Sequence, residues 1–185
     1  MLKWTSLKKN KYFKIYTAIS ILSILLGFLF YFKLKENINI SEINLELLIK
    51  NHSIYHILFV SITFFLSFLL IGSFLGIMGF CFELISIVIL GIGLFSAYHI
   101  RGLFLFITLL TFKLFYLLLL IYLITRGFKI AKTIVSKQSH FKGNILIYIK
   151  EAIYTSLIII AIETFNYFIG YKIITFFTKL LQIML

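Results

Sequence analysis

The chain has 185 residues, of which 62% are hydrophobic and 13% are charged, and its formal net charge is +12. A soluble domain averages roughly 45–50% apolar and ~25% charged residues, so this composition excludes a soluble globular fold and a disordered tail. The positive charges lie in short segments between apolar runs, which favours a membrane protein over a nucleic-acid-binding protein. We therefore expect a single membrane domain over residues 1–185, built as an all-α polytopic bundle.

Five apolar runs are predicted to cross the membrane, over residues 15–32, 54–75, 80–98, 103–125 and 145–169. The first run is longer than a signal-peptide core of 7–15 residues and no small-x-small cleavage site follows it, so we expect an uncleaved span. The glycines that divide the apolar stretch between Ser53 and His99 predict a tight turn at residues 76–79. The Gly72-x-x-x-Gly76 spacing also fits a close helix-packing face.

Polar segments separate these runs. Residues 33–52 are predicted to form an outer loop with a short amphipathic helix that begins at Ser41, its N-cap. Residues 126–150 are predicted to form a basic loop, and residues 171–185 an amphipathic helix on the membrane surface. Eleven of the 18 Lys and Arg residues fall on the side shared by the N-terminus and the 126–150 loop. The positive-inside rule then predicts a cytoplasmic N-terminus.

Three charged residues fall deep inside the predicted spans, Glu83, Lys113 and Glu163, whereas Lys150 and Glu151 lie at the entrance of the last span. A charge at the bilayer centre costs ~2.5–3.5 kcal/mol on insertion scales, so each is expected to find a partner. We predict that Lys113 contacts Glu83 or Glu163. An interhelical ion pair that fixes the bundle is the favoured interpretation, and a proton or ion relay is the alternative.

His52 and His56 are four residues apart, so one helix face can carry both as a possible metal-binding pair. No third ligand follows at a set spacing, which favours interfacial histidines at a helix entrance, with His99 on the same outer side. The chain contains no Asp, so it lacks a Ser-His-Asp triad and an aspartyl dyad, and it has no phosphate-binding glycine loop. We expect no catalytic residues, no cofactor, no metal site and no enzyme activity.

Several segments together resemble the stage II sporulation protein M family of endospore-forming bacteria. The most specific of them is Ile162-Glu163-Thr164-Phe165 in the last span, where the family tends to have a Glu followed by a small residue and Phe. The others are residues 14–20, 52–56, 91–98 and 101–105. The resemblance covers most of the chain in order and spacing.

The resemblance implies a non-catalytic scaffold of the cell membrane that acts during engulfment in endospore formation. It implies two partners at the septal membrane besides lipid, an amidase-type peptidoglycan hydrolase and a lytic transglycosylase, and no nucleic acid. The Gly72–Gly76 face and the outer loop are the expected partner contacts. Two alternatives remain open. One is a small transport subunit that binds a solute on the outer side, using His52, His56, His99 and Arg101. The other is an immunity protein against a membrane-active bacteriocin.

Overall fold

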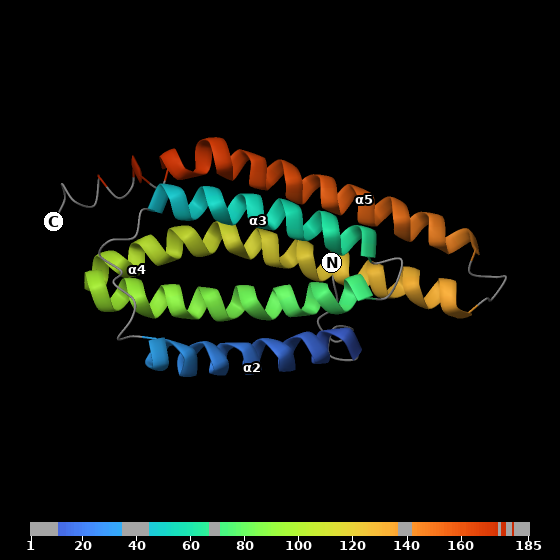
Figure 1. Cartoon of the computed structure of the whole chain (residues 1–185), viewed down its shortest axis with the longest axis horizontal. Coiled ribbons are helices and arrows are strands. Elements are labelled where there is room, and N and C mark those ends of the chain that lie inside the picture. The colour runs from blue at the N-terminus through green and yellow to red at the C-terminus, as the bar shows by residue number, and fades with distance from the viewer. Residues whose placement is uncertain are drawn as a thin grey trace, which may run out of the picture.

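The computed structural model describes residues 11–34, 45–66, 71–136, 142–173, 175–176 and 179. All of these residues are helical, which confirms the predicted all-α class for the part of the chain described. The elements are α2 (Lys11–Leu34), α3 (Leu45–Leu66), α4 (Ile71–Ser136), α5 (Lys142–Phe165) and the π-helix η4 (Asn166–Gly170). Figure 1 shows them lying side by side along one long axis.

Helix α4 consists of two limbs, residues 71–98 and 100–136, joined by a sharp bend at His99. His99 has φ 52° and ψ −125°, on the left-handed side of the backbone map that a residue with a Cβ rarely adopts. At Gly102, just after the bend, a Cβ would overlap the backbone carbonyl of Leu94. A glycine there lets the two limbs fold back closely upon each other as a helical hairpin.

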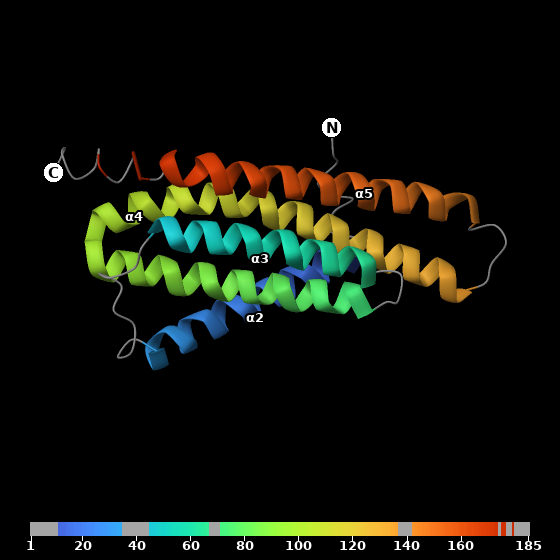
Figure 2. The same ribbon diagram turned by 45° about the horizontal axis from the view of Figure 1, so that its top comes forward.

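Successive segments run in opposite directions along the bundle. Helix α2 begins at the end where the second limb of α4 finishes and α5 begins, and the His99 bend lies at the other end with the end of α5 (Figures 1 and 2). Helix α2 crosses the others at a slant in Figure 2 and packs mainly against α4. Helix α3 lies between α4 and α5 and contacts both of them.

Among the described residues, four helical stretches are long and apolar enough to cross a membrane, so the chain has the character of a membrane protein. They are Lys14–Lys33, Ile71–Ser96, Tyr98–Ile134 and Ile145–Ile173. Helix α3 is not among them, and its first twelve residues include Lys50, Asn51, His52, Ser53 and His56. The exposed surface is rich in large apolar side chains such as Phe32, Phe65 and Leu118, as expected for a surface that faces lipid.

The boundary between the second and third predicted spans differs from the sequence prediction. Helix α3 ends at Leu66 and α4 begins at Ile71, so Gly76 and Gly79 lie within a helix and form no turn. A Cβ at Gly76 would lie 2.5 Å from Ile124 Cγ1, and one at Gly79 would overlap the Phe59 ring. These glycines serve close helix packing, which gives the same sequence signal as a turn.

The predicted basic loop is largely helical. The second limb of α4 continues through Arg126 to Ser136, and α5 already begins at Lys142. Ile130 and Ala131 are buried, and the Arg126 Nε atom pairs with Glu151 Oε2 of α5 at 2.7 Å. Because this face has apolar and ionic partners on α5, the helix extends beyond the apolar run that defined the predicted span.

Helix α3 also extends beyond its predicted span. It begins at Leu45 and runs without a break into the apolar segment, whereas the sequence placed residues 45–52 in an outer loop. Ser41, the predicted N-cap, lies outside the described residues, as do Ile174 and residues 177–178 and 180–185 of the predicted surface tail. The described part of the tail continues helically from η4 through residues 171–173.

Candidate functional site

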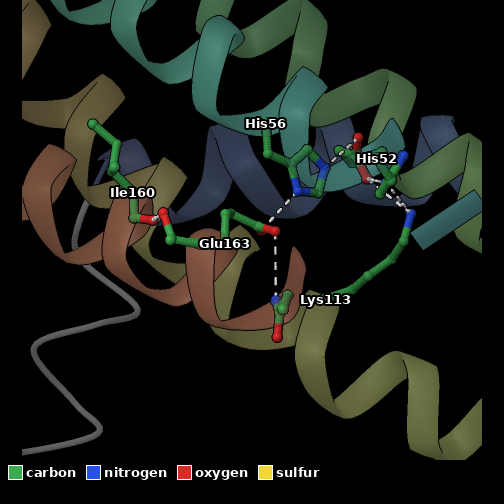
Figure 3. Close-up of polar contacts among 8 residues, drawn as sticks. His52, His56, Lys113, Ile160 and Glu163 are labelled. Carbon is green, nitrogen blue, oxygen red and sulfur yellow. Dashed lines mark hydrogen bonds and ion pairs between the residues drawn. The ribbon is translucent and has the colours of Figure 1, made fainter. Parts of the chain in front are cut away.

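Five ionisable side chains meet inside the bundle, and we call them the polar centre. Helix α3 supplies two of them, the two limbs of α4 one each, and α5 one: His52, His56, Glu83, Lys113 and Glu163. Figure 3 shows His56 between Glu163 and His52, with the Lys113 side chain reaching toward His52. The centre therefore joins all the long helices except α2.

The predicted contact of Lys113 is present. Its Nζ atom donates to Glu83 Oε2 at 3.0 Å, while Glu163 bonds to His56 instead. Lys113 Nζ also lies 2.7 Å from His52 Nε2, which is itself 3.1 Å from Glu83 Oε2. A lysine ammonium has no lone pair, so His52 Nε2 accepts a hydrogen bond here with its lone pair turned toward the ammonium.

His56 lies between two carboxylates. Its Nδ1 atom is 2.7 Å from Glu163 Oε1, and its Nε2 atom is 3.0 Å from Glu83 Oε1. An ionised carboxylate can only accept hydrogen bonds, so a doubly protonated imidazolium satisfies both contacts. In that form His56 and the Lys113 ammonium would balance the two carboxylates within the centre.

Aromatic and amide groups hold this arrangement in place. The Tyr116 ring stacks on the His56 imidazole with centroids 3.7 Å apart and planes 6° apart. Asn166 is the first residue of the π-helix η4, and its Nδ2 atom donates to Glu163 Oε2 at a distance of 3.4 Å. Short π-helical segments often occur at functional sites, where they re-aim side chains.

The polar centre is graded in exposure and lies deep in the bundle. The exposed fraction falls from 28% for the His52 side chain and 13% for Lys113 to 3% for His56 and 4% for Glu163. Glu83 lies twelve residues after Ile71 and thirteen before Ser96, the ends of its candidate span. Glu83 therefore lies near the middle of its candidate span, ~1.5 Å along the helix axis being covered by each residue.

The histidines are the part of the site that sequence reasoning misjudged. His56 is buried, so the interpretation of both residues as interfacial histidines at a helix entrance is wrong for it. The four-residue spacing was the available signal, but the third group beside the two histidines is Glu83, which lies 27 residues after His56 and is brought in by α4. His52, His56 and Glu83 each present a donor atom, and these atoms lie within 4.8 Å of one another.

The remaining candidate residues lie elsewhere. His99 and Arg101 are exposed at the bend of α4, outside the polar centre. Gly72 is buried, and Gly76 packs between Thr63 of α3 and Ile124 of the second limb. The Gly72–Gly76 face was expected to contact a partner protein. At Gly76 this face packs against other helices of the bundle instead.

Comparisons of the chain with known protein families, curated proteins and solved structures found no match. The polar centre therefore carries the functional argument.

Proposed function

We propose that the protein is a transport protein of the cell membrane that moves a cation through the polar centre. The observation that carries this proposal is the linked set of five ionisable side chains at mid-depth of the bundle. Ionisable residues at this depth are expensive, and they usually mark ion paths or proton relays. One ion pair would be enough to fix two helices, whereas this set extends over α3, both limbs of α4 and α5.

The contacts form a continuous chain along which a proton can move. It starts at the partly exposed His52, passes through Lys113, Glu83 and His56, and ends at the buried Glu163. Each link is a heavy-atom distance of 3.0 Å or less. Histidine suits such a relay because its two ring nitrogens can take up a proton on one side and release it on the other.

The topology proposed with this function has five spans and a cytoplasmic N-terminus. It counts α3 as a span, because α3 lies among the other helices and carries two members of the polar centre (Figure 1). The end of the bundle opposite the His99 bend holds Arg126, Lys129 and Lys132, and the positive-inside rule assigns that end to the cytoplasm. The bend then faces the outside.

Flux measurements on liposomes containing the purified full-length chain test the transport proposal. Pyranine trapped inside reports protons, a trapped Zn²⁺ indicator reports a divalent cation, and a potassium diffusion potential drives uptake. We expect uptake of at least one of the two ions, reduced tenfold or more in Glu83→Gln and in His56→Gln. Removing a carboxylate or an imidazole interrupts the chain of contacts at its middle.

Glu151→Gln is the matched control, because it makes the same chemical change at an acid that pairs with Arg126 outside the polar centre. It should retain wild-type flux. Equal flux in the wild type, the two variants of the polar centre and protein-free liposomes would overturn the transport proposal. Size-exclusion profiles of each variant verify that a lost flux does not come from an unfolded protein.

A second candidate is the scaffold role that the sequence resemblance implies, with a peptidoglycan amidase and a lytic transglycosylase as partners. Support comes from the Ile162-Glu163-Thr164-Phe165 segment, which carries the resemblance and supplies Glu163 to the polar centre. In this case the centre holds the bundle together, and partners dock on outward apolar faces. On α2 the exposed residues Leu25, Leu29 and Phe32 form such a face.

Affinity purification from the native host tests the scaffold role. The tagged chain is solubilised late in growth, and the proteins that accompany it are identified by mass spectrometry. Recovery of an amidase together with a transglycosylase-like wall enzyme is the expected result for a scaffold. Their absence, with a transport ATPase recovered in their place, would exclude the scaffold role and favour a transport subunit.

A further inference from the structure

We propose that His52, His56 and Glu83 form a binding site for a divalent transition-metal ion of the Zn²⁺ type. This inference deepens the proposed transport function by naming its cation, and rests on it to that extent. His52 and His56 lie one turn apart on α3, and Glu83 lies opposite them on α4. Their donor atoms already converge, since all lie within 4.8 Å of one another.

The distances between donor atoms suit a metal with short bonds. Two metal–ligand bonds of ~2.0–2.1 Å at a tetrahedral angle separate their donor atoms by roughly 3.3 Å. His56 Nε2 lies 3.0 Å from Glu83 Oε1, and His52 Nε2 lies 3.1 Å from Glu83 Oε2. The three donor atoms lie within 4.8 Å of one another, so a closing movement of at most about 1.5 Å at the widest pair, to roughly 3.3 Å, lets the carboxylate and both rings share one ion.

The surroundings of His56 resemble the outer shell of a metal site. Ligating histidines usually donate their second ring N–H to a carboxylate, which fixes the ring and makes it a better ligand. Glu163 Oε1 lies 2.7 Å from His56 Nδ1, and the stacked Tyr116 ring limits rotation of the imidazole. Nε2 is thereby directed at Glu83. Glu163 is a positioning residue in this arrangement and not a ligand.

Charge balance points to a divalent ion. Two carboxylates, Glu83 and Glu163, face the histidines, and Lys113 supplies the one ammonium among these five side chains. A divalent cation held by His52, His56 and Glu83 would bring two positive charges to these carboxylates, with the ammonium moving away from Glu83. Lys113 Nζ lies where the lone pairs of His52 Nε2 and Glu83 Oε2 converge, so it competes with the metal for them.

The donor set selects the class of metal. Two imidazole nitrogens with one carboxylate suit Zn²⁺ and neighbouring ions such as Co²⁺, Ni²⁺ and Fe²⁺. Ca²⁺ and Mg²⁺ prefer sites built from oxygen ligands. The partly exposed His52 and Lys113 lie at the edge of the centre, which gives an ion a side from which to enter.

Co²⁺ absorption tests the site in the purified full-length chain, in detergent and without a histidine tag. Co²⁺ bound at low coordination number gives strong visible bands, whereas hydrated Co²⁺ gives weak ones. We expect strong bands at one Co²⁺ per chain, removed by Zn²⁺ and unaffected by Mg²⁺. The bands should be absent in His56→Gln and Glu83→Gln, and Glu163→Gln should bind about 10–100-fold more weakly.

Lys113→Met separates a metal site from a purely structural ion network. Removing the competing ammonium should tighten Co²⁺ binding tenfold or more, and Zn²⁺ should raise the thermal stability of this variant more than that of the wild type. Glu151→Gln should bind Co²⁺ like the wild type. A wild type and a Lys113→Met variant that both give only the hydrated Co²⁺ spectrum would overturn the metal site.

The outcomes for binding and for flux can be told apart. Proton flux that depends on Glu83, without Co²⁺ bands in any variant, would overturn the metal site and leave the transport proposal standing. Co²⁺ bands that depend on His56 and Glu83, without flux of either ion, would support the site and overturn the transport proposal.

Discussion

The Tyr116 ring covers the His56 imidazole almost face to face, with centroids 3.7 Å apart and an interplanar angle of 6°. Tyr116 is 2% exposed and comes from the second limb of α4, one turn after Lys113. The same stretch of helix thus supplies both the cation beside His52 and the ring that orients His56. Rotation of this limb would disturb both histidines at once.

Substitution of Tyr116 tests the role of this stack. Tyr116→Ala leaves a cavity beside His56 and should lower the free energy of unfolding by about 3 kcal/mol. Tyr116→Phe keeps the ring and should cost less than ~1 kcal/mol. Unfolding by SDS in mixed micelles measures both. Equal losses in the two variants would mean that the hydroxyl, and not the ring, matters.

Removal of one member of the Lys113–Glu83 pair should cost more than removal of both. Glu83→Gln and Lys113→Met each leave a partner without its opposite charge in the interior, which should cost about 3 kcal/mol. The double variant should lose clearly less than the sum of the two. A double-mutant cycle on unfolding free energies measures the coupling, and strict additivity would contradict a direct interaction.

The hairpin in α4 should depend on Gly102. A Cβ there would overlap the Leu94 carbonyl, which is backbone and cannot move aside, so Gly102→Ala should cost roughly 3 kcal/mol. Gly91→Ala is the control. Its Cβ would lie 2.8 Å from Cε2 of the Phe106 ring, which can rotate, so it should cost less. Thermal unfolding followed by circular dichroism ranks the two variants, and the reverse order would contradict the backbone contact.

Cysteine labelling tests the proposed orientation. In a Cys81→Ser background, Ser96→Cys lies near the His99 bend and Lys132→Cys lies toward the opposite end of the second limb, both at exposed positions. An impermeant maleimide should label Ser96→Cys in intact cells and Lys132→Cys only after permeabilisation. The opposite pattern would invert the topology.

The fold class and one contact of the site were predictable from the sequence. Long apolar runs with few charges are expected to form helices in lipid, because a helix pairs its backbone N–H and C=O groups within the same segment. The Lys113 contact followed from the high energy of a lone charge at mid-depth. Both predictions depend on local composition and on the solvent, and neither requires knowledge of how the helices pack.

The rest of the site depends on packing. The burial and the contacts of His56 depend on Glu83, Tyr116 and Glu163, which lie 27, 60 and 107 residues further along the chain. No spacing rule joins such distant positions. The helix ends were misplaced for a related reason, since Gly79 has the composition of a turn but is placed against Phe59 by tertiary contact.

The position of the two histidines early in the chain has a consequence for membrane insertion. Helix α3 leaves the ribosome while Glu83 is still inside the exit tunnel and before Lys113 and Glu163 have been made, so its polar half has no partners when it first meets the translocon. We expect α3 to remain at the membrane–water interface and to enter the bilayer only together with the α4 hairpin. A chain truncated before Glu83 and released from the ribosome should therefore leave α3 accessible to water-soluble reagents, while α2 is already inserted.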